Sequence, residues 1–348
     1  MAMIAIIGAG VAGLAAGREL QRAGHAVTLF EKSRGLGGRV TTRRVAGCAI
    51  DHGAQLMKAP TPALQALVAE TPGAHAIALP VWAFDRVGQL RAGDPAQNDE
   101  PRWTWPGGIG ALGRQLGQAL DVRRETTISA LRGGPGAYEL LAEGQVYGPF
   151  AAVLLTAPAP QSAAILGASA IEAATRDTLL AALAPAAYRP CLSVALAYAR
   201  RPDLPWYAAV NSDRGHPIAW LACEHAKPER APAGVGLLLA HMAPGWSEAH
   251  WDALPKGTYG QGTPLPAPVE EVHGLVQALL GDELGAPLWA DAHRWRYALC
   301  DAPCGPAATA GVAGLFVAGD MEAGQGRVNL AIESGWAAAR RISEQAQG

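Results

Sequence analysis

The 348-residue sequence is short of charge, of cysteine and of long apolar runs, and each shortage excludes a class of protein. Charged residues make up 17% of the chain and the net charge is -2, so the basic face that nucleic acid requires is missing. No apolar run approaches the roughly 20 residues of a membrane span. The start of the chain lacks the basic region of a signal peptide, so we expect a cytoplasmic protein.

The five cysteines are odd in number and scattered. No Cys-x-x-Cys pair occurs, so we expect neither a zinc or other metal site nor a redox disulfide. Cys300 and Cys304 can meet in a loop, but reduced, partly buried thiols are the simpler expectation in a cytoplasmic chain. A Gly-x-Ser-x-Gly elbow is also missing, so the sequence offers no serine nucleophile of that type.

What the chain does contain is a strand–helix–strand pattern near its start. An apolar strand over residues 4–7, a helix over 11–23 and a second strand over 26–30 follow one another closely. Glu31 ends the pattern, roughly 20 residues beyond the intervening glycines, where it can accept hydrogen bonds from a ribose 2′-hydroxyl. Such an acid repels a 2′-phosphate, so the pattern predicts FAD or NAD rather than NADP.

Three glycines connect the first strand to the helix. Gly8 permits a tight turn, Gly10 removes a side chain where a pyrophosphate must approach, and Gly13 lets the helix lie close on the strand. The first helical residues, Val11 and Ala12, offer unpaired N–H groups and the positive end of the helix dipole. A second element, Lys32-Ser33-Arg34-Gly35-Leu36-Gly37-Gly38-Arg39, follows the second strand. Its glycines and arginines predict a further grip on the pyrophosphate.

Two later strands have the apolar character of buried parallel strands. The strand over 152–158 ends at Ala157, and the strand over 314–320 ends at Gly319 and Asp320. Ligands bind at the carboxyl ends of such strands. A helix over 330–344 follows the last one. Length and composition suit roughly two domains.

The run Gly8-x-Gly10-x-x-Gly13, Glu31-Lys32 and Arg34-x-x-Gly37-Gly38-Arg39 resembles the opening of the flavin amine oxidase superfamily, which includes phytoene-desaturase-like and protoporphyrinogen-oxidase-like enzymes. The resemblance implies non-covalently bound FAD on an α/β, Rossmann-type domain of the glutathione-reductase/amine-oxidase type. It implies a second, α+β substrate domain built on an antiparallel sheet. The expected FAD domain is discontinuous, over residues 1–57, 101–160 and 298–348, and the expected cap comprises 58–100 and 161–297.

The same resemblance assigns roles around the flavin. It brings residues 53–55 and 105–107 to the ring, places the adenine at the backbone of Val122, and puts Asp320 on the ribityl chain or pyrophosphate. The N-terminus of the last helix, residues 327–329, would face the pyrimidine edge, where reduced flavin gains negative charge that a helix N-terminus stabilises. The expected FAD contacts are Gly8, Gly10, Val11, Ala12, Gly13, Glu31, Lys32, Arg34, Gly38, Arg39, Gly53, Ala54, Gln55, Trp105, Pro106, Gly107, Val122, Ala157, Gly319, Asp320, Arg327, Val328 and Asn329.

Some of these residues have simpler interpretations. Trp105 fits a core position as well as a flavin-facing wall. Asp51 and His52 suggest an acid–base pair, but bonding to backbone in a turn is the more ordinary expectation. The middle of the chain concentrates aromatic residues on an expected antiparallel sheet, which suits an apolar pocket for a flat ring, although most of them are expected in the core. No catalytic residue is assigned, and the substrate-pocket candidates are Trp220, His241, Arg294, Trp295 and Tyr297.

Further segments, residues 32–35, 51–55, 223–228 and 293–298, resemble the bacterial renalase family. The resemblance implies an oxidase of isomeric dihydronicotinamide dinucleotides, reduced at carbon two or six, with hydride passing to flavin N5 and O2 as the final acceptor. The products would be NAD(P)+ and hydrogen peroxide, and the protein a monomer or homodimer. An amine oxidase, a polyene desaturase and a flavin-binding protein without turnover remain alternatives. Of the four lysines that an amine oxidase would draw on, only Lys58 is expected near the flavin.

Overall fold

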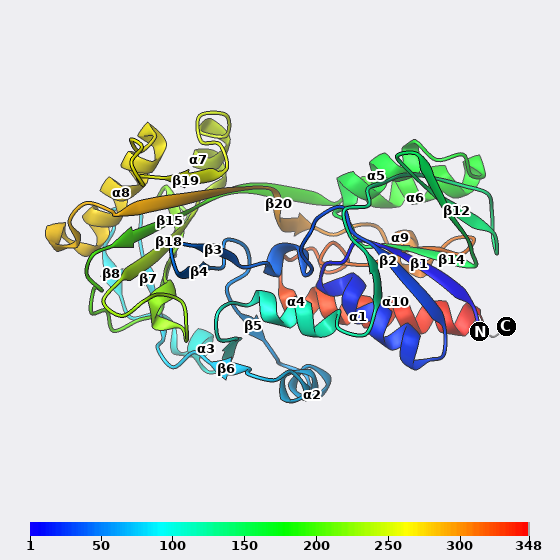
Figure 1. Ribbon diagram of the computed structural model, residues 1–348, viewed down its shortest axis with the longest axis horizontal. Helices are drawn as coiled ribbons and strands as arrows, with labels where there is room; N and C mark the ends of the chain where they lie inside the picture. The colour runs from blue at the N-terminus through cyan, green and yellow to red at the C-terminus, as the bar shows by residue number, and fades with distance from the viewer. Residues whose placement is uncertain (347–348) are drawn as a thin grey trace. The chain divides into compact units, whose positions relative to one another are not determined.

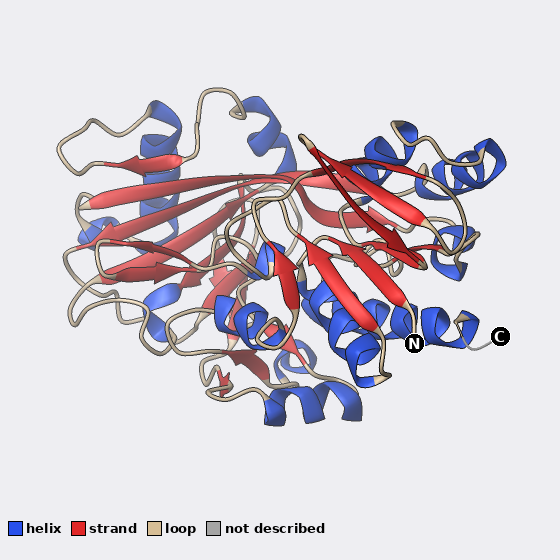
Figure 2. Ribbon diagram, turned by 45° about the vertical axis from the view of Figure 1, so that its right-hand side comes forward, coloured by secondary structure: helices blue, strands red, loops and turns tan. Residues whose placement is uncertain are grey.

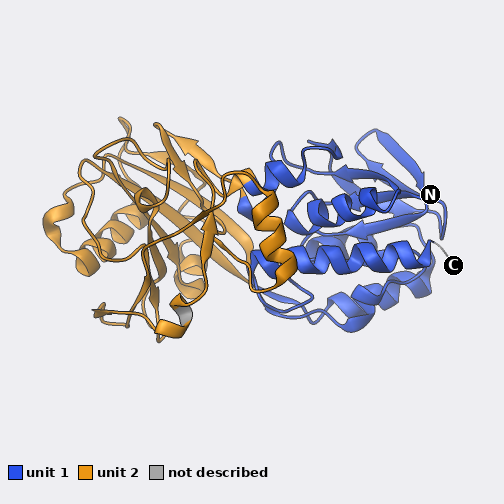
Figure 3. Ribbon diagram, turned by 90° about the horizontal axis from the view of Figure 1, so that it is seen from below, with its two compact units in different colours: residues 1–40, 112–188, 299–348 blue, residues 41–111, 189–298 orange. Residues whose placement is uncertain are grey.

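The computed structural model describes residues 1–346, which divide into two compact units (Figure 3). Unit 1 comprises Met1–Val40, Leu112–Tyr188 and the chain from Leu299 onward. Unit 2 comprises Thr41–Ala111 and Arg189–Ala298. Both units are therefore discontinuous in sequence. None of the helices in the described chain has the length and apolar character needed to cross a bilayer.

Unit 1 is built on a five-stranded sheet. In spatial order its strands are β10 (Asp121–Arg123), β2 (Ala26–Phe30), β1 (Met3–Ile7), β14 (Ala152–Leu155) and β21 (Leu315–Val317). Every neighbouring pair runs parallel, so the carboxyl ends of all five strands lie at one edge. Strands β1, β14 and β21 are nearly continuous apolar runs, as is typical of strands covered on both faces.

One face of this sheet is covered by α1 (Val11–Arg22) and α10 (Val328–Gln345), which lie side by side (Figure 1). The two helices approach very closely, because a Cβ atom placed on Gly335 of α10 would lie 2.2 Å from the carbonyl oxygen of Ala12. Both have an apolar stripe towards the sheet, and both begin at the edge that holds the carboxyl ends of the strands.

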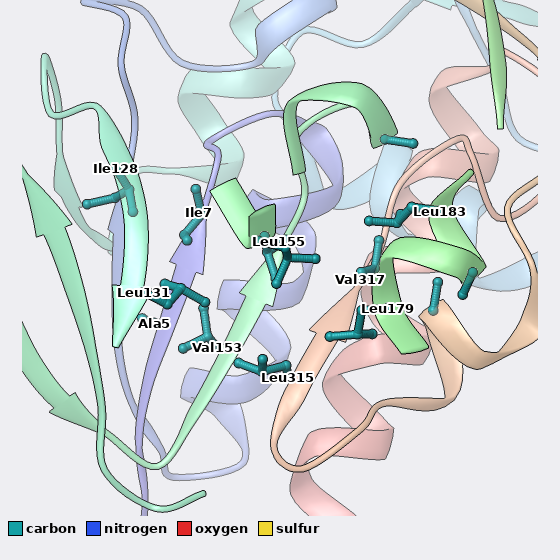
Figure 4. Packing of buried hydrophobic residues seen from close by; sticks show 14 of the residues in the cluster. Ala5, Ile7, Ile128, Leu131, Val153, Leu155, Leu179, Leu183, Leu315 and Val317 are labelled. Carbon is teal, nitrogen blue, oxygen red and sulfur yellow. The ribbon is translucent and has the colours of Figure 1, made fainter. Parts of the chain in front are cut away.

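The opposite face packs against a smaller layer. It contains a three-stranded antiparallel sheet and three helices: β11 (Ile128–Arg132), β12 (Tyr138–Ala142), β13 (Gln145–Phe150), α5 (Ala159–Gly167), α6 (Ala173–Leu183) and α9 (Pro306–Ala310). Alternate residues of β1 and β14, such as Ile7 and Leu155, meet Leu131 of β11 and Leu179 of α6 in one buried cluster (Figure 4). Unit 1 thus has three layers around one parallel sheet.

Unit 2 is built on an eight-stranded sheet, the group of long strands at the left of Figure 2. Its order is β19 (Gly257–Tyr259), β20 (Trp289–Ala302), β15 (Ala187–Tyr198), β18 (Gly236–Met242), β17 (Ile218–Cys223), β16 (Ala208–Asn211), β7 (Val81–Phe84) and β8 (Leu90–Arg91). The pairing of β16 with β7 is parallel, so the sheet is mixed rather than purely antiparallel as expected. One face buries a core with α7 (Pro244–Ala249) and α8 (Ala267–Leu280).

Shorter elements complete the chain. They are β3 (Arg43–Val45), β4 (Cys48–Ile50), β5 (Met57–Lys58), β6 (His75–Ala76), β9 (Arg102–Thr104), α2 (Pro62–Glu70), α3 (Pro95–Asn98) and α4 (Gly110–Leu116). Strand β4 packs on the second face of the large sheet, with Ala195 and Leu237 in its cluster. Strand β9 pairs with both β5 and β6.

The two units differ from the expected domains at three places. Residues 161–188 belong to unit 1, because α5 and α6 fill the layer under the parallel sheet. Residues 41–57 and 101–111 belong to unit 2, because β4 and β9 pair and pack there. The residue patterns within these segments do not show which of the two cores each segment joins.

Candidate functional site

The first part of the candidate site is the glycine turn after β1 in unit 1. Gly8 adopts a φ of +108°, a conformation that side chains disfavour, and an added Cβ would lie 2.6 Å from Thr156 Oγ1. The Thr156 hydroxyl lies 3.0 Å from the carbonyl oxygen of Ile7 and 2.9 Å from that of Gly8, to which it donates. A Cβ on Gly13 would meet the Gly8 carbonyl oxygen at 2.1 Å. The turn is thus shaped by glycine on two sides and fixed by a threonine after β14.

The N-terminus of α1 presents backbone to open space. Its N-cap is Gly10, which makes no side-chain cap, and a Cβ placed there would meet nothing within 4 Å. The first helical N–H groups, including those of Val11 and Ala12, have no acceptor within their own helix. Space beside uncapped N–H donors is what a pyrophosphate needs, so this turn fits the phosphates of FAD.

The second glycine element lies directly against the first. Gly37 N–H donates to the carbonyl oxygen of Ala9 at 2.8 Å, and a Cβ on Gly38 would lie 3.3 Å from Gly10 Cα. Lys32 and Arg34 of the same segment are exposed, and Lys32 Nζ lies 3.4 Å from Gln161 Oε1. The two glycine elements therefore form one continuous backbone surface, while the side chains of Lys32 and Arg34 extend towards solvent.

Glu31 has a structural task that the sequence did not reveal. Its carboxylate is buried and accepts hydrogen bonds from Ala9 N–H at 2.9 Å and Ser33 N–H at 2.8 Å. It therefore ties the end of β2 to the glycine turn. Each carboxylate oxygen has a second lone pair, so the same group can still receive a ribose hydroxyl.

Arg39 and Asp320 were expected as separate cofactor contacts, but they bind each other. The guanidinium donates to both oxygens of Asp320, at 2.7 and 2.8 Å, in a two-pronged ion pair. Burial opposes the charge of Arg39, but the nearby carboxylate outweighs it and raises the pKa of Arg39. Burial, with Asp320 nearby, raises the pKa of the Cys300 thiol to about 11. That thiol stays protonated and is a poor nucleophile.

Most of the remaining predicted residues of unit 1 lie near the carboxyl ends of the parallel strands. Ala157 follows β14, and Gly319, which follows β21, donates its N–H to Ser334 Oγ at 2.9 Å. Arg327 is the exposed N-cap of α10 and makes no side-chain cap, so the helix start at Val328 and Asn329 leaves N–H groups available. Val122 lies in the edge strand β10, whose outer side has no partner strand in its sheet.

In unit 2, the predicted flavin neighbours 53–55 extend from a segment fixed to one face of the large sheet. His52 is buried, and its ring nitrogens lie 3.1 Å from Ser193 Oγ and 2.7 Å from Asp291 Oδ1. The His52 carbonyl oxygen accepts from His241 Nε2 at 2.9 Å and from Trp295 Nε1 at 3.0 Å. Gly53 and Ala54 follow and are half-buried.

Asp51 and His52 do not pair with each other, and the expected turn with backbone bonding is wrong for His52. Asp51 belongs to a separate, fully buried charge cluster with Glu224, Lys227 and Arg230. Arg230 Nη1 lies 2.5 Å from Asp51 Oδ2 and 3.3 Å from Glu224 Oε2, and Lys227 pairs with Glu224. Burial lowers the pKa of Lys227. This cluster, called the buried charge cluster below, is paired internally.

Gln55 is anchored by three donors. Its Oε1 accepts from Trp220 Nε1 at 2.8 Å and from Tyr207 Oη at 3.3 Å, and its carbonyl oxygen lies 3.4 Å from Lys227 Nζ. Lys227 is thus the lysine next to the predicted flavin neighbours. Lys58, the one expected there, instead pairs with Glu100 at 3.1 Å and is about a third exposed, so that expectation finds no support.

Trp105, Pro106 and Gly107 form a turn held by other parts of unit 2. Gly107 N–H donates to the Pro228 carbonyl oxygen at 3.2 Å, and Arg44 donates to the Gly107 carbonyl oxygen at 3.1 Å. Trp105 is fully buried, which favours the core interpretation of its ring.

The substrate-pocket candidates divide between two faces of the large sheet. Trp220 and His241 are direct cross-strand neighbours, and Trp295 joins them through the His52 carbonyl oxygen. Tyr297 follows Trp295 by two residues and shares its side of β20. Arg294 alternates to the other side of β20, where it donates to the Trp251 carbonyl oxygen at 2.7 Å and lies over the Trp251 ring.

The face that carries Trp220, His241, His293 and Trp295 is called the aromatic face below. His293 stacks near His52 and lies 4.4 Å, between ring centroids, from Trp295. Burial lowers the pKa of His241 to about 4 and that of His293 to about 3. Both imidazoles are therefore neutral at pH 7, and the aromatic face carries rings without charge.

Sequence reasoning missed the residues that hold these groups in place. Thr156, Ser193, Asp291 and Arg230 carry no local motif, and their partners are 141 to 239 residues away in sequence. A buried-type position occupied by a polar residue in an apolar strand, as Ser193 is in β15, was the one available signal.

The parallel sheet, the uncapped helix start and the acid after β2 define a dinucleotide-binding protein of the Rossmann type. Residues 6–71 match the NAD(P)-binding Rossmann-like domain, and residues 74–343 match the flavin-containing amine oxidoreductases. The chain therefore belongs to the flavin-containing amine oxidoreductase family. This is a family of FAD-dependent oxidoreductases, which confirms the fold class, the enzyme class and the cofactor expected from the sequence.

Two curated relatives match short segments only. AofH of Mycobacterium tuberculosis, a flavin-containing monoamine oxidase by name, is 46% identical over 67 residues, 19% of this chain and 15% of that protein. The 4,4'-diapophytoene desaturase of Staphylococcus haemolyticus is 44% identical over 57 residues, 16% of this chain and 11% of that protein. The matched segments thus span about a seventh or less of either relative.

Solved structures resemble the whole chain. Cyclohexylamine oxidase from Brevibacterium oxydans superposes with a TM-score of 0.76 at 14% identity, over 100% of both chains. Putrescine oxidase bound to putrescine superposes with a TM-score of 0.72 at 14% identity, over 98% of both chains. At these identities the likeness establishes the fold alone.

Proposed function

We propose that this protein is an FAD-dependent oxidase of isomeric dihydronicotinamide dinucleotides, reduced at carbon two or six of the ring. The substrate and O2, with one proton, would yield NAD(P)+ and hydrogen peroxide. Bound FAD supplies the redox chemistry, since N5 of its ring accepts a hydride and the reduced ring returns two electrons to O2. The residues for holding it are the two glycine elements, Glu31 and the N-terminus of α10.

The observation that carries the proposal is the uncharged aromatic face of unit 2. Trp220 and Trp295 are held by indole N–H bonds to Gln55 and to the His52 carbonyl oxygen, so their rings are fixed. The two histidines on this face are neutral at pH 7. A flat, electron-rich ring needs stacking and exclusion of water rather than an acid–base dyad, because aromatisation drives hydride transfer.

Anaerobic stopped-flow mixing tests the proposal. The purified yellow protein is mixed with 2- or 6-dihydro-NAD(P), and flavin absorbance near 450 nm is followed on the order of milliseconds to seconds. We expect complete bleaching by the isomers and return of the absorbance on adding O2, with one H2O2 per substrate. Absence of bleaching by any isomer at millimolar concentration would exclude the function.

A second candidate, amine oxidation, is favoured by the family. Its structural support is Lys227, a buried lysine beside Gln55, since lysine near the flavin is a recurring feature in such enzymes. A panel of primary amines and polyamines in the same anaerobic assay separates the two. If this candidate is right, amines bleach the flavin and the dihydronicotinamides do not. If the protein is a desaturase, only a polyene bleaches it. In a non-catalytic flavin-binding protein, none of these reductants bleaches the flavin.

A further inference from the structure

We infer that Gln55 is the residue that selects the substrate's ring carboxamide, with its side-chain N–H donating to the carboxamide oxygen. The inference rests on the proposed function and deepens it by naming the group that recognises the substrate. It follows from three features of Gln55: the direction of its amide, its burial, and the chemistry of its neighbours.

The direction of the amide is fixed by its partners. An indole N–H can only donate, so the atom of Gln55 that lies 2.8 Å from Trp220 Nε1 must be the oxygen. Tyr207 Oη lies 3.3 Å from the same oxygen. Burial raises the pKa of Tyr207 well above its ordinary value, so that hydroxyl keeps its proton and donates. The amide cannot exchange its two ends without losing both bonds, and Nε2 must point away from them.

The Nε2 donor is buried and has no partner within residues 1–346. Gln55 is 5% exposed, and Nε2 makes no hydrogen bond to any described residue. Leaving a buried amide donor unpaired costs on the order of 1–3 kcal/mol. A ligand that brings an acceptor to this atom recovers that cost, so the position selects for acceptors.

The chemistry of an acceptor discriminates among the candidate substrates. A protonated amine presents only N–H donors, and a polyene presents no polar atom, so neither can satisfy Nε2. The carbonyl oxygen of a ring carboxamide can. The neighbouring His241 is neutral at pH 7, and Lys227 pairs with the carboxylates of the buried charge cluster. The position therefore favours a neutral acceptor over a carboxylate.

The test is isothermal calorimetry on the FAD-loaded protein with two oxidised ligands, NAD+ and its thionicotinamide analogue, in which sulfur, a weak acceptor, replaces the carboxamide oxygen. We expect the wild type to bind NAD+ about tenfold more tightly than the analogue, the value of one buried hydrogen bond. In Gln55→Met the ratio of the two dissociation constants should fall to within about twofold of one. The control is Gln65→Met, which should keep the wild-type ratio, because Gln65 is exposed and its side chain donates to the Ala59 carbonyl oxygen.

The outcomes are separable. A tenfold ratio that persists in Gln55→Met overturns the inference and leaves the proposed function intact. If the tenfold ratio persists in Gln55→Met and the flavin absorption band shifts, Nε2 contacts the flavin instead of the substrate, and the inference is again overturned. Wild-type protein that neither binds NAD+ nor is bleached by its dihydro isomers overturns both. Should Gln55→Met fail to fold, Trp220→Phe removes the bond that fixes the amide and should itself reduce the ratio; an unchanged ratio there contradicts the inference.

Discussion

At the scale of single residues, unit 2 contains four charges that solvent does not reach. The side chains of Asp51, Glu224, Lys227 and Arg230 have no exposed surface, and two negative groups face two positive ones. Asp51 also accepts from Thr42 Oγ1 at 2.7 Å and from Ile109 N–H. Desolvating each ion costs several kcal/mol, so the arrangement survives only while every member is paired. The cluster therefore holds together the loops around residues 42, 51, 109 and 227.

Replacing Arg230 by methionine should expose this dependence. The variant keeps much of the side-chain volume but leaves two carboxylates with one cation, and we expect a loss of about 3–5 kcal/mol in the free energy of unfolding. Urea titration followed by circular dichroism measures it. Arg200→Met is the matched control, since Arg200 pairs with Glu283 in the open and should lose less than about 1 kcal/mol. Equal, small losses in both variants would contradict the role of the cluster.

At the scale of elements, the close contact of α1 with α10 determines how unit 1 is assembled. Gly335 lies where α10 crosses Ala12, in the first turn of α1. The contact is made by backbone atoms, so no side-chain rearrangement can make room for even a methyl group. Two helices that bear directly on the glycine turn are therefore locked to each other.

Gly335→Ala and Gly274→Ala should change stability in opposite directions. Both glycines lie inside helices, where alanine ordinarily stabilises by roughly 0.5–1 kcal/mol. At Gly274 of α8 an added Cβ meets nothing within 4 Å, so the ordinary gain is expected there. At Gly335 the new methyl would lie 2.2 Å from the Ala12 carbonyl oxygen, so α1 must shift and FAD binding should weaken as well. Melting temperatures and FAD dissociation constants of the two variants test this, and stabilisation of both would refute the contact.

At the scale of the whole molecule, burial governs how stability depends on pH. Six of the nine histidines have a pKa lowered mainly by burial: His25, His216, His225, His241, His273 and His293. The unfolded chain takes up protons at these histidines near pH 6.5, while the folded protein takes them up only at lower pH. More protons are then bound by the unfolded state, so acid favours unfolding.

The free energy of unfolding should accordingly fall as the pH is lowered from 7 to 5. Each histidine with a strongly lowered pKa contributes up to about 1.4 kcal/mol per pH unit in that window. Urea midpoints at pH 7, 6 and 5 measure the slope. His241→Gln removes one such group and should flatten the curve, whereas a pH-independent wild type would show that the histidines are not buried as described.

Local sequence patterns predicted the helices and strands better than the long-range contacts between them. The strand over 26–30 has the predicted bounds, and the helix predicted over 11–23 ends at Arg22, since apolar spacing and glycine act within a few residues. The 14-residue strand β20 was not predicted as one strand, because its mixed polar and aromatic residues follow no simple alternation. Among site residues, the glycine cradle follows from the motif, but the pairing of Arg39 with Asp320 joins positions 281 residues apart, which no local rule can foresee.

The parallel sheet of unit 1 has a consequence for synthesis. Strand β14 has β21 as its outer neighbour, and α1 packs against α10, yet β21 and α10 are synthesised only after the whole middle of the chain. The nascent N-terminal segment must therefore wait, with its apolar surface uncovered, while nearly three hundred residues are added. Translation arrested before β21 should leave a chain that recruits chaperones and retains no yellow colour.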